Sequence, residues 1–207
     1  MHKHIARIKQ HFKSADPLLF KIIKEMELKL FETGKDPARY FHELCEAIIS
    51  QQLAGKAANA IIKRFTELFK GKAITPARVA AIQPRKFRAI GMSWAKARYV
   101  HDLAEKISTK EVKLKNLAEL GNEEVILELT KVKGIGRWTA EMFLIFTLGR
   151  EDVFSFGDLG LRNGFEHVYG KRHSKNQKSM EKIAERWSPY RSYASLALWH
   201  TQDSKKK

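Results

Sequence analysis

Two glycines and an aspartate in the second half of the chain have the residue types and spacing that chemistry on a polyanion requires. Gly134 and Gly136 lie on either side of one apolar residue, Ile135, between two segments with helical periodicity. A turn of this kind leaves backbone N–H groups pointing outward at the start of the second helix, where the positive end of the helix dipole adds to their effect. The pair therefore predicts a phosphate-binding turn. Asp158 follows at the head of the next predicted helix, and a phosphate site with a nearby carboxylate indicates chemistry on a nucleic acid.

Each of these residues also has an ordinary structural interpretation. Glycines end helices in every class of protein, so the turn would equally suit a plain corner between two helices. Asp158 is a favourable N-cap for the helix that it precedes, and capping can coexist with a catalytic role. Lys96 and Arg98, in the segment SWAKAR, suit phosphate contacts or simple solvated charge equally well.

The charge of the whole chain favours an anionic partner. Lysine and arginine number 39 against 23 aspartate and glutamate residues, which gives a formal net charge of +16. An excess of this size is typical of proteins that bind nucleic acids. A basic protein that uses its charge only for solubility is the alternative.

Composition excludes several other classes of protein. The chain has 207 residues, 43% of them apolar, enough for one core or two small lobes. The single cysteine, Cys45, lies in an apolar run, so we expect it to be buried, and it allows neither an internal disulfide nor a four-cysteine iron–sulfur cluster. The eight histidines lack metal-ligand spacing, so we expect no metal held by side chains and no cofactor. Without a spanning segment or a signal-peptide core, we expect no membrane partner and a cytoplasmic or nuclear location.

The elements that must position these groups are all predicted helices. Pairs such as Asp16-Pro17, Asp36-Pro37 and Thr75-Pro76 combine an N-cap with a proline in the first turn, and runs with period-two alternation are almost absent. The sequence predicts an all-α domain over residues 1–203, an exposed basic loop at 171–178 and a disordered basic tail at 204–207. The predicted helices cover residues 17–31, 37–48, 56–69, 95–106, 123–131, 139–148, 159–169, 179–186 and 193–200, with short helices beginning at 76 and 84.

Four separated motifs resemble those of one enzyme family. KVKGIGRWTAEMF (131–143) is similar to the helix–hairpin–helix element of the base-excision DNA glycosylases that carry a downstream catalytic aspartate. DVFSFGDLGLRNGF (152–165) resembles the aspartate segment of their 3-methyladenine DNA glycosylase II branch. IISQQLAGKAANAIIKRF (48–65) and ERWSPYRSYASLALWH (185–200) extend the resemblance, in the same order, over roughly residues 16–201. It implies two helical lobes, a helix–hairpin–helix motif at about 123–148 and an active site in the cleft between the lobes.

The resemblance implies roles for three residues at the active site. Asp158 would face the flipped nucleotide, where its carboxylate stabilises the positive charge left on the deoxyribose or orients the attacking water. Trp138 stands where bifunctional members carry a Schiff-base lysine, which implies base release without strand cleavage. Trp138 and Trp199 would form the substrate pocket, because an aromatic face attracts a positively charged methylated base by about 0.5–2 kcal/mol. Core packing is the alternative for any tryptophan, and Trp187 is a weaker pocket candidate.

The resemblance also implies the residues that contact DNA. Gln52 would enter the gap left by the extruded base, with Leu53 as the alternative, while helix capping is the other interpretation of Gln51 and Gln52. The residues expected to hold the DNA backbone belong to the hairpin and are Lys133, Gly134, Ile135, Gly136, Arg137 and Thr139. The chain departs from the family at Gly157, which stands where some relatives have a second acid, and at Phe156, which replaces a smaller residue. The change at Phe156 leaves the substrate range open.

The sequence therefore predicts a monofunctional DNA glycosylase that acts as a monomer on double-stranded DNA containing a damaged base. The expected products are alkylated purines of the 3-methyladenine and 7-methylguanine type. One alternative is a glycosylase for deaminated or oxidised bases. The other is a non-catalytic helix–hairpin–helix module, which Asp158 disfavours because a carboxylate repels phosphate.

Overall fold

Every regular element that the structure describes is a helix. The computed structural model describes residues 2–32 and 36–203, so the predicted tail at 204–207 lies outside the described residues. The predicted all-α class is confirmed, and none of the described helices is long and apolar enough to cross a membrane. The helices are α1 (His2–Ala15), α2 (Pro17–Ile23), α3 (Pro37–Ser50), α4 (Gly55–Glu67), α5 (Pro76–Ala80), α6 (Pro84–Ala89), α7 (Trp94–Ser108), α8 (Asn122–Leu129), α9 (Arg137–Phe146), α10 (Leu159–Tyr169), α11 (Lys171–Ser174), α12 (Gln177–Glu185) and α13 (Arg191–Asp203).

The predicted starts of several helices are confirmed, because each depends on a local cap. The side chains of Asp16, Asp36 and Thr75 each accept a hydrogen bond from an amide in the first turn of the helix that follows. The next residue in each case is a proline, whose missing N–H costs nothing at that position.

Three predictions about the elements are wrong, and tertiary contacts explain them. The helix predicted over 17–31 ends at Ile23, because Lys9 of α1 donates to the carbonyl oxygens of Lys24 at 2.9 Å and Met26 at 3.3 Å. α1 itself was not predicted, and it forms with Ile8 and Phe12 buried. The loop predicted at 171–178 contains α11, where Ser174 is buried and donates to Glu166 at 2.9 Å.

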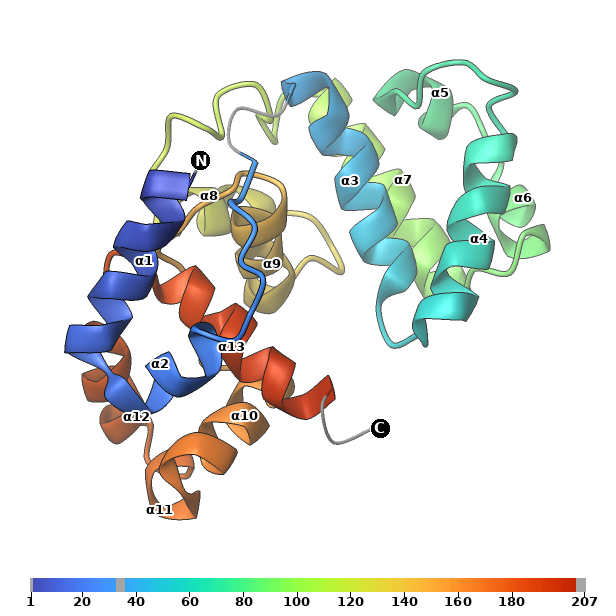
Figure 1. The fold of residues 1–207 in the computed structure, drawn as a ribbon. Coiled ribbons are helices and arrows are strands. Elements are labelled where there is room, and N and C mark those ends of the chain that lie inside the picture. The colour runs from blue at the N-terminus through green and yellow to red at the C-terminus, as the bar shows by residue number, and fades with distance from the viewer. Residues whose placement is uncertain (1, 33–35, 204–207) are drawn as a thin grey trace. The chain divides into compact units, whose positions relative to one another are not determined.

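The chain forms two compact units, which agrees with the predicted pair of helical lobes. The first unit combines residues 1–33 with 144–207, and its core includes Phe12, Phe165 and Tyr193. Within it α10 packs on α13 (Figure 1). Trp187 belongs to this core rather than to a pocket, since its ring is buried and its indole nitrogen donates to Asp16 at 2.9 Å.

The second unit covers residues 34–143, and in it α3 packs against both α4 and α7 (Figure 1). Tyr40, Leu44, Phe65 and Phe87 are among its buried residues. Cys45 is buried here as predicted, and burial raises the pKa of its thiol. Two further parts of this unit are α8 and the start of α9, which the glycine turn joins.

Candidate active site

Asp158 lies at the N-terminus of α10 and caps that helix. Its Oδ1 atom accepts a hydrogen bond from the backbone amide of Leu161 at 2.7 Å and another from the indole Nε1 of Trp199 at 3.0 Å. Only 8% of the residue is exposed. The capping interpretation is therefore correct, and it accompanies a direct contact between two residues predicted for the active site.

Gly160 allows Trp199 of α13 to approach this carboxylate. A Cβ atom added at Gly160 would lie 3.0 Å from Cδ1 of Trp199 and 3.1 Å from Oδ1 of Asp158. At Gly164, one turn further along α10, an added Cβ would lie 2.4 Å from the carbonyl oxygen of Leu198. The prediction of site residues missed both glycines, although their spacing of four is the sequence signal for two helices in close contact.

Two phenylalanines that the sequence prediction also missed extend the aromatic surface beside Trp199. Phe146, at the end of α9, stacks on Trp199 with ring centroids 5.8 Å apart and an interplanar angle of 28°. Phe31 meets Phe146 edge to face at 6.5 Å. Phe146 is 48% exposed despite its size, and an aromatic ring that keeps one surface toward solvent is suited to stacking on a planar ligand.

This arrangement combines a nearly buried carboxylate with an aromatic wall in one unit. The two N–H donors hold Asp158 in one orientation. A carboxylate fixed in this way stabilises a positive charge that develops next to it, since no reorganisation is needed when the charge appears. Aromatic faces attract cations as well. The site is therefore suited to a reaction whose transition state carries positive charge.

Along the glycine turn, backbone amides that donate a hydrogen bond within the protein alternate with amides that do not. The amide of Lys133 donates to Oδ2 of Asp102 at 2.8 Å, and that of Ile135 donates to the carbonyl of Val132 at 3.1 Å. Within the part of the chain that the structure describes, the amides of Gly134 and Gly136 donate to no other group. Their positions suit the predicted phosphate site, while the buried side chain of Ile135 anchors the turn.

The other predicted hairpin contacts differ in how accessible they are. Arg137 is bound by two carboxylates, at 2.8 Å from Glu123 and 2.9 Å from Glu141. The hydrogen bond between Arg137 and Glu123 raises the pKa of the guanidinium and lowers that of the carboxyl. The side chain of Lys133 is 78% exposed, whereas Thr139 is buried with its hydroxyl toward Gln51 at 3.3 Å. The roles of these residues in DNA binding stay predictions.

The remaining predicted site residues are Trp138 and two residues of the loop at 51–54, and these lie in the second unit. Trp138 is 46% exposed in the first turn of α9, and its role as a pocket residue stays a prediction. Gln52 and Leu53 are both exposed in the turn between α3 and α4, as insertion into a duplex would require. Among the described residues, no group of histidine, cysteine, aspartate or glutamate side chains is placed to hold a metal ion.

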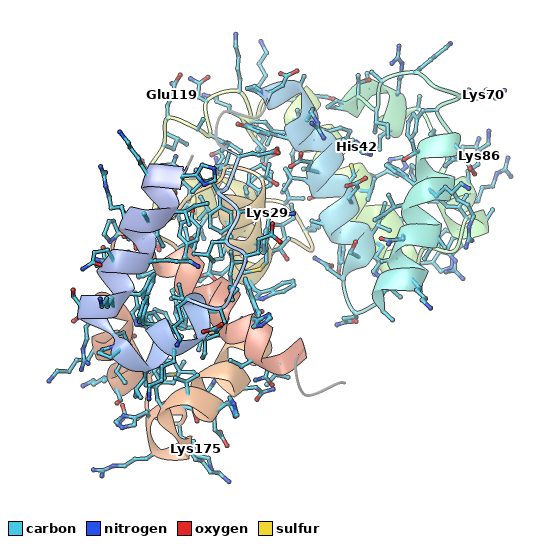
Figure 2. The ribbon with its side chains drawn as sticks, in the orientation of Figure 1. Lys29, His42, Lys70, Lys86, Glu119 and Lys175 are labelled. Atoms are coloured by element: carbon cyan, nitrogen blue, oxygen red, sulfur yellow. The ribbon has the colours of Figure 1, made fainter. Side chains whose placement is uncertain are left out.

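Basic side chains extend from the surfaces of both units. Figure 2 shows Lys70 and Lys86 on the second unit and Lys175 on the first, and all three are exposed. Solvated lysines of this kind supply the electrostatic attraction that any polyanion experiences before specific contacts form.

Comparisons with known proteins agree with this chemistry. Residues 45–189 match the HhH-GPD superfamily of base excision DNA repair proteins. The chain is 39% identical over 163 residues to DNA-3-methyladenine glycosylase 1 of Schizosaccharomyces pombe, which covers 78% of this chain and 72% of that protein. Among solved structures, a DNA-3-methyladenine glycosidase from Bacillus halodurans superposes with a TM-score of 0.80 at 34% identity, covering 95% of this chain and 90% of the other. A 3-methyladenine DNA glycosylase from S. pombe in complex with abasic DNA gives a TM-score of 0.74 at 32% identity, and the superposition covers 95% of this chain and 97% of the other.

Proposed function

Because the chain belongs to the HhH-GPD superfamily of base excision DNA repair proteins, we propose that it is a DNA glycosylase acting on alkylated purines. The substrates would be bases of the 3-methyladenine and 7-methylguanine type in double-stranded DNA, and the protein would act as a monomer. The observation that carries the proposal is the contact between Asp158 and Trp199 beside exposed aromatic surface. Relatives and structural neighbours named as 3-methyladenine glycosylases support the same substrate class.

The reaction places distinct demands on the base and on the sugar. A purine methylated at N3 or N7 already carries positive charge, so it leaves with the electrons of the N-glycosidic bond without a strong general acid. The deoxyribose is left with positive charge at C1′, which the Asp158 carboxylate stabilises while it orients the water that attacks C1′. That water loses a proton, and the products are the free base and an abasic site. The aromatic rings attract the cationic base before it leaves.

We further propose that the enzyme releases the base without cutting the strand. Strand cleavage in related enzymes begins when a hairpin lysine forms an imine, and the resemblance of the motifs puts Trp138 at the matching position. The lysines nearest to it in sequence have carboxylate partners, since Lys131 lies 2.6 Å from Glu128 and Lys133 lies 4.0 Å from Asp102.

A second candidate function is a helix–hairpin–helix module that binds DNA without catalysis. The open amides of Gly134 and Gly136 would serve either function. Asp158 favours the enzyme, because binding alone gains nothing from a carboxylate near phosphates.

The test is base release from a set of duplexes. Purified protein is incubated with four duplexes that each contain one 3-methyladenine, 7-methylguanine, hypoxanthine or uracil. Free base is measured in each case, and strand breaks are measured with and without subsequent alkali. We expect release of the two methylated purines, with strand breaks only after alkali. Release of hypoxanthine or uracil alone would assign the other substrate class. Release from no duplex would favour the binding module, and strand breaks without alkali would contradict the monofunctional mechanism.

A further inference from the structure

The loop between α3 and α4 has a backbone conformation that requires support from outside the loop. α3 ends at Ser50, and Gln51 leaves the helix with φ −51° and ψ 132°. Gln52 then adopts φ +56°, a left-handed conformation that is unfavourable for a residue with a Cβ atom. The last carbonyl groups of a helix also lack partners within the helix. A loop in this state keeps one conformation only when its neighbours hold it.

Lys96, in the first turn of α7, supplies part of that support. Its ammonium donates to the carbonyl oxygen of Ile49 at 2.9 Å and to that of Gln51 at 2.5 Å. A cation at this end of a helix satisfies the last carbonyl groups and complements the helix dipole. Burial lowers the pKa of Lys96. The ammonium is therefore occupied by the end of α3 and is not directed at solvent in the way that a phosphate contact would require.

Gln51 connects the same loop to the glycine turn. Its Nε2 atom donates to the carbonyl oxygen of Gly134 at 2.7 Å and to the hydroxyl of Thr139 at 3.3 Å. Gly134 is one of the two residues whose amide is open for a phosphate. The first residue of the loop is therefore hydrogen-bonded to the turn that would grip the DNA backbone.

One face of α7 supports both the loop and the turn. Tyr99 and Asp102 follow Lys96 at intervals of three residues, which places all three on the same side of the helix. A Cβ atom added at Gly134 would lie 2.2 Å from the Tyr99 ring, so this tyrosine packs directly beneath the turn. Asp102 accepts the amide of Lys133 at 2.8 Å. α7 therefore sets the distance between the loop and the phosphate-binding turn.

We propose that Lys96 and Gln51 are positioning residues that hold the loop at a fixed distance from the glycine turn. With the turn bound to a phosphate, the exposed side chains of Gln52 and Leu53 enter the base stack at the extruded nucleotide. The inference rests on the proposed function, because it assigns how that enzyme keeps a base out of the helix. Loss of either positioning residue raises the cost of extrusion but leaves Asp158 and Trp199 unchanged.

The test compares a paired lesion with a mismatched lesion. Single-turnover release of 7-methylguanine is measured from duplexes in which it faces cytosine or adenine, since extrusion costs least for a mismatched base. The variants are Lys96→Met and Gln51→Leu, with Lys63→Met, an exposed lysine of α4, as the charge-matched control. Thermal unfolding establishes that each variant is folded, and because Gln51→Leu removes no charge, it provides an independent test if Lys96→Met is unstable. A duplex with 2-aminopurine beside the lesion reports unstacking by fluorescence, independently of catalysis.

We expect release from the paired duplex to fall about tenfold in both positioning variants and release from the mismatched duplex to fall less than about threefold. The fluorescence increase should shrink in the same two variants, while Lys63→Met matches the wild type in every readout. Equal losses on both duplexes, or no loss on either, would overturn the inference. If the wild type releases no base at all, the proposed function fails, and the fluorescence comparison alone then decides the role of the loop.

Discussion

At the scale of single residues, Asp158 has a structural role that is compatible with the proposed chemical one. The Oδ1 atom that caps α10 also accepts the indole N–H of Trp199. The sequence was sufficient to predict both residues as candidates, because the aspartate precedes a helical segment and both motifs resemble one family, and the structure places the two in contact. It was not sufficient to identify Gly160, Phe31 or Phe146, since their roles depend on how α10, α13 and the end of α9 pack.

Trp199→Phe separates the hydrogen bond from the aromatic contact. Phenylalanine retains a ring that stacks on Phe146 but lacks the N–H that holds Asp158. A hydrogen bond to a charged group contributes about 1.5–3 kcal/mol, so single-turnover base release should fall about tenfold or more. Trp94→Phe, at an exposed tryptophan of the second unit, is the matched control and should keep the wild-type rate. An unchanged rate in Trp199→Phe would show that the indole N–H does not position the carboxylate.

The lowered pKa of Asp152 makes the folding stability depend on pH. Burial opposes ionisation of this carboxyl group, but hydrogen bonds from Arg191 at 2.6 Å and Ser188 at 2.9 Å outweigh it and hold the pKa below the ordinary value. The unfolded chain then binds this proton more readily than the folded protein does. The contribution to stability is complete above the unfolded pKa of about 4 and is lost as the pH falls through the folded pKa.

Urea unfolding at pH 7, 4 and 3 checks this expectation with Asp152→Asn. The wild type should lose more free energy of unfolding than the variant does between pH 7 and pH 3, because the variant has no carboxylate to protonate. Parallel losses in the two proteins would mean that Asp152 does not contribute to the acid sensitivity.

At the scale of helices, the starts of those with a local cap were predictable, whereas α1, α11 and the end of α2 were not. A cap such as Asp36 acts on amides within two or three residues, so the local sequence contains the whole signal. The end of α2 depends on Lys9, which lies on another helix, and α11 depends on the buried hydroxyl of Ser174. Long-range contacts of this kind leave no periodic pattern in the segment that they terminate.

Gly164→Ala tests the close packing of α10 on α13. The new Cβ atom would lie 2.4 Å from the backbone carbonyl oxygen of Leu198, so one of the two helices must move. Overpacking of a core typically costs about 1–3 kcal/mol, and we expect that loss in the free energy of unfolding measured with urea. Gly55→Ala is the control at the first residue of α4, where an added Cβ meets nothing within 4 Å. Equal stability of Gly164→Ala and the wild type would contradict the packing described here.

At the scale of the whole molecule, the net charge of +16 predicts strongly salt-dependent binding. Each phosphate contact releases condensed counterions, so the logarithm of the affinity falls linearly with the logarithm of salt concentration. With about six contacts, affinity for an undamaged duplex should fall roughly 10³-fold between 50 and 200 mM salt. Fluorescence anisotropy over this range measures the slope, and an affinity independent of salt would exclude phosphate contacts as its source.

In the proposed mechanism the negative charge of Asp158 drives release of the base, and the variant Asp158→Asn removes that charge. Asparagine keeps an Oδ1 atom that can cap α10 and accept from Trp199, so folding and DNA affinity should be preserved while the charge is lost. Single-turnover release of 7-methylguanine should then fall at least about 100-fold, the scale of losing one preorganised electrostatic contact. Release by Asp158→Asn at the wild-type rate, from duplex bound with wild-type affinity, would show that the charge of Asp158 does not drive the reaction.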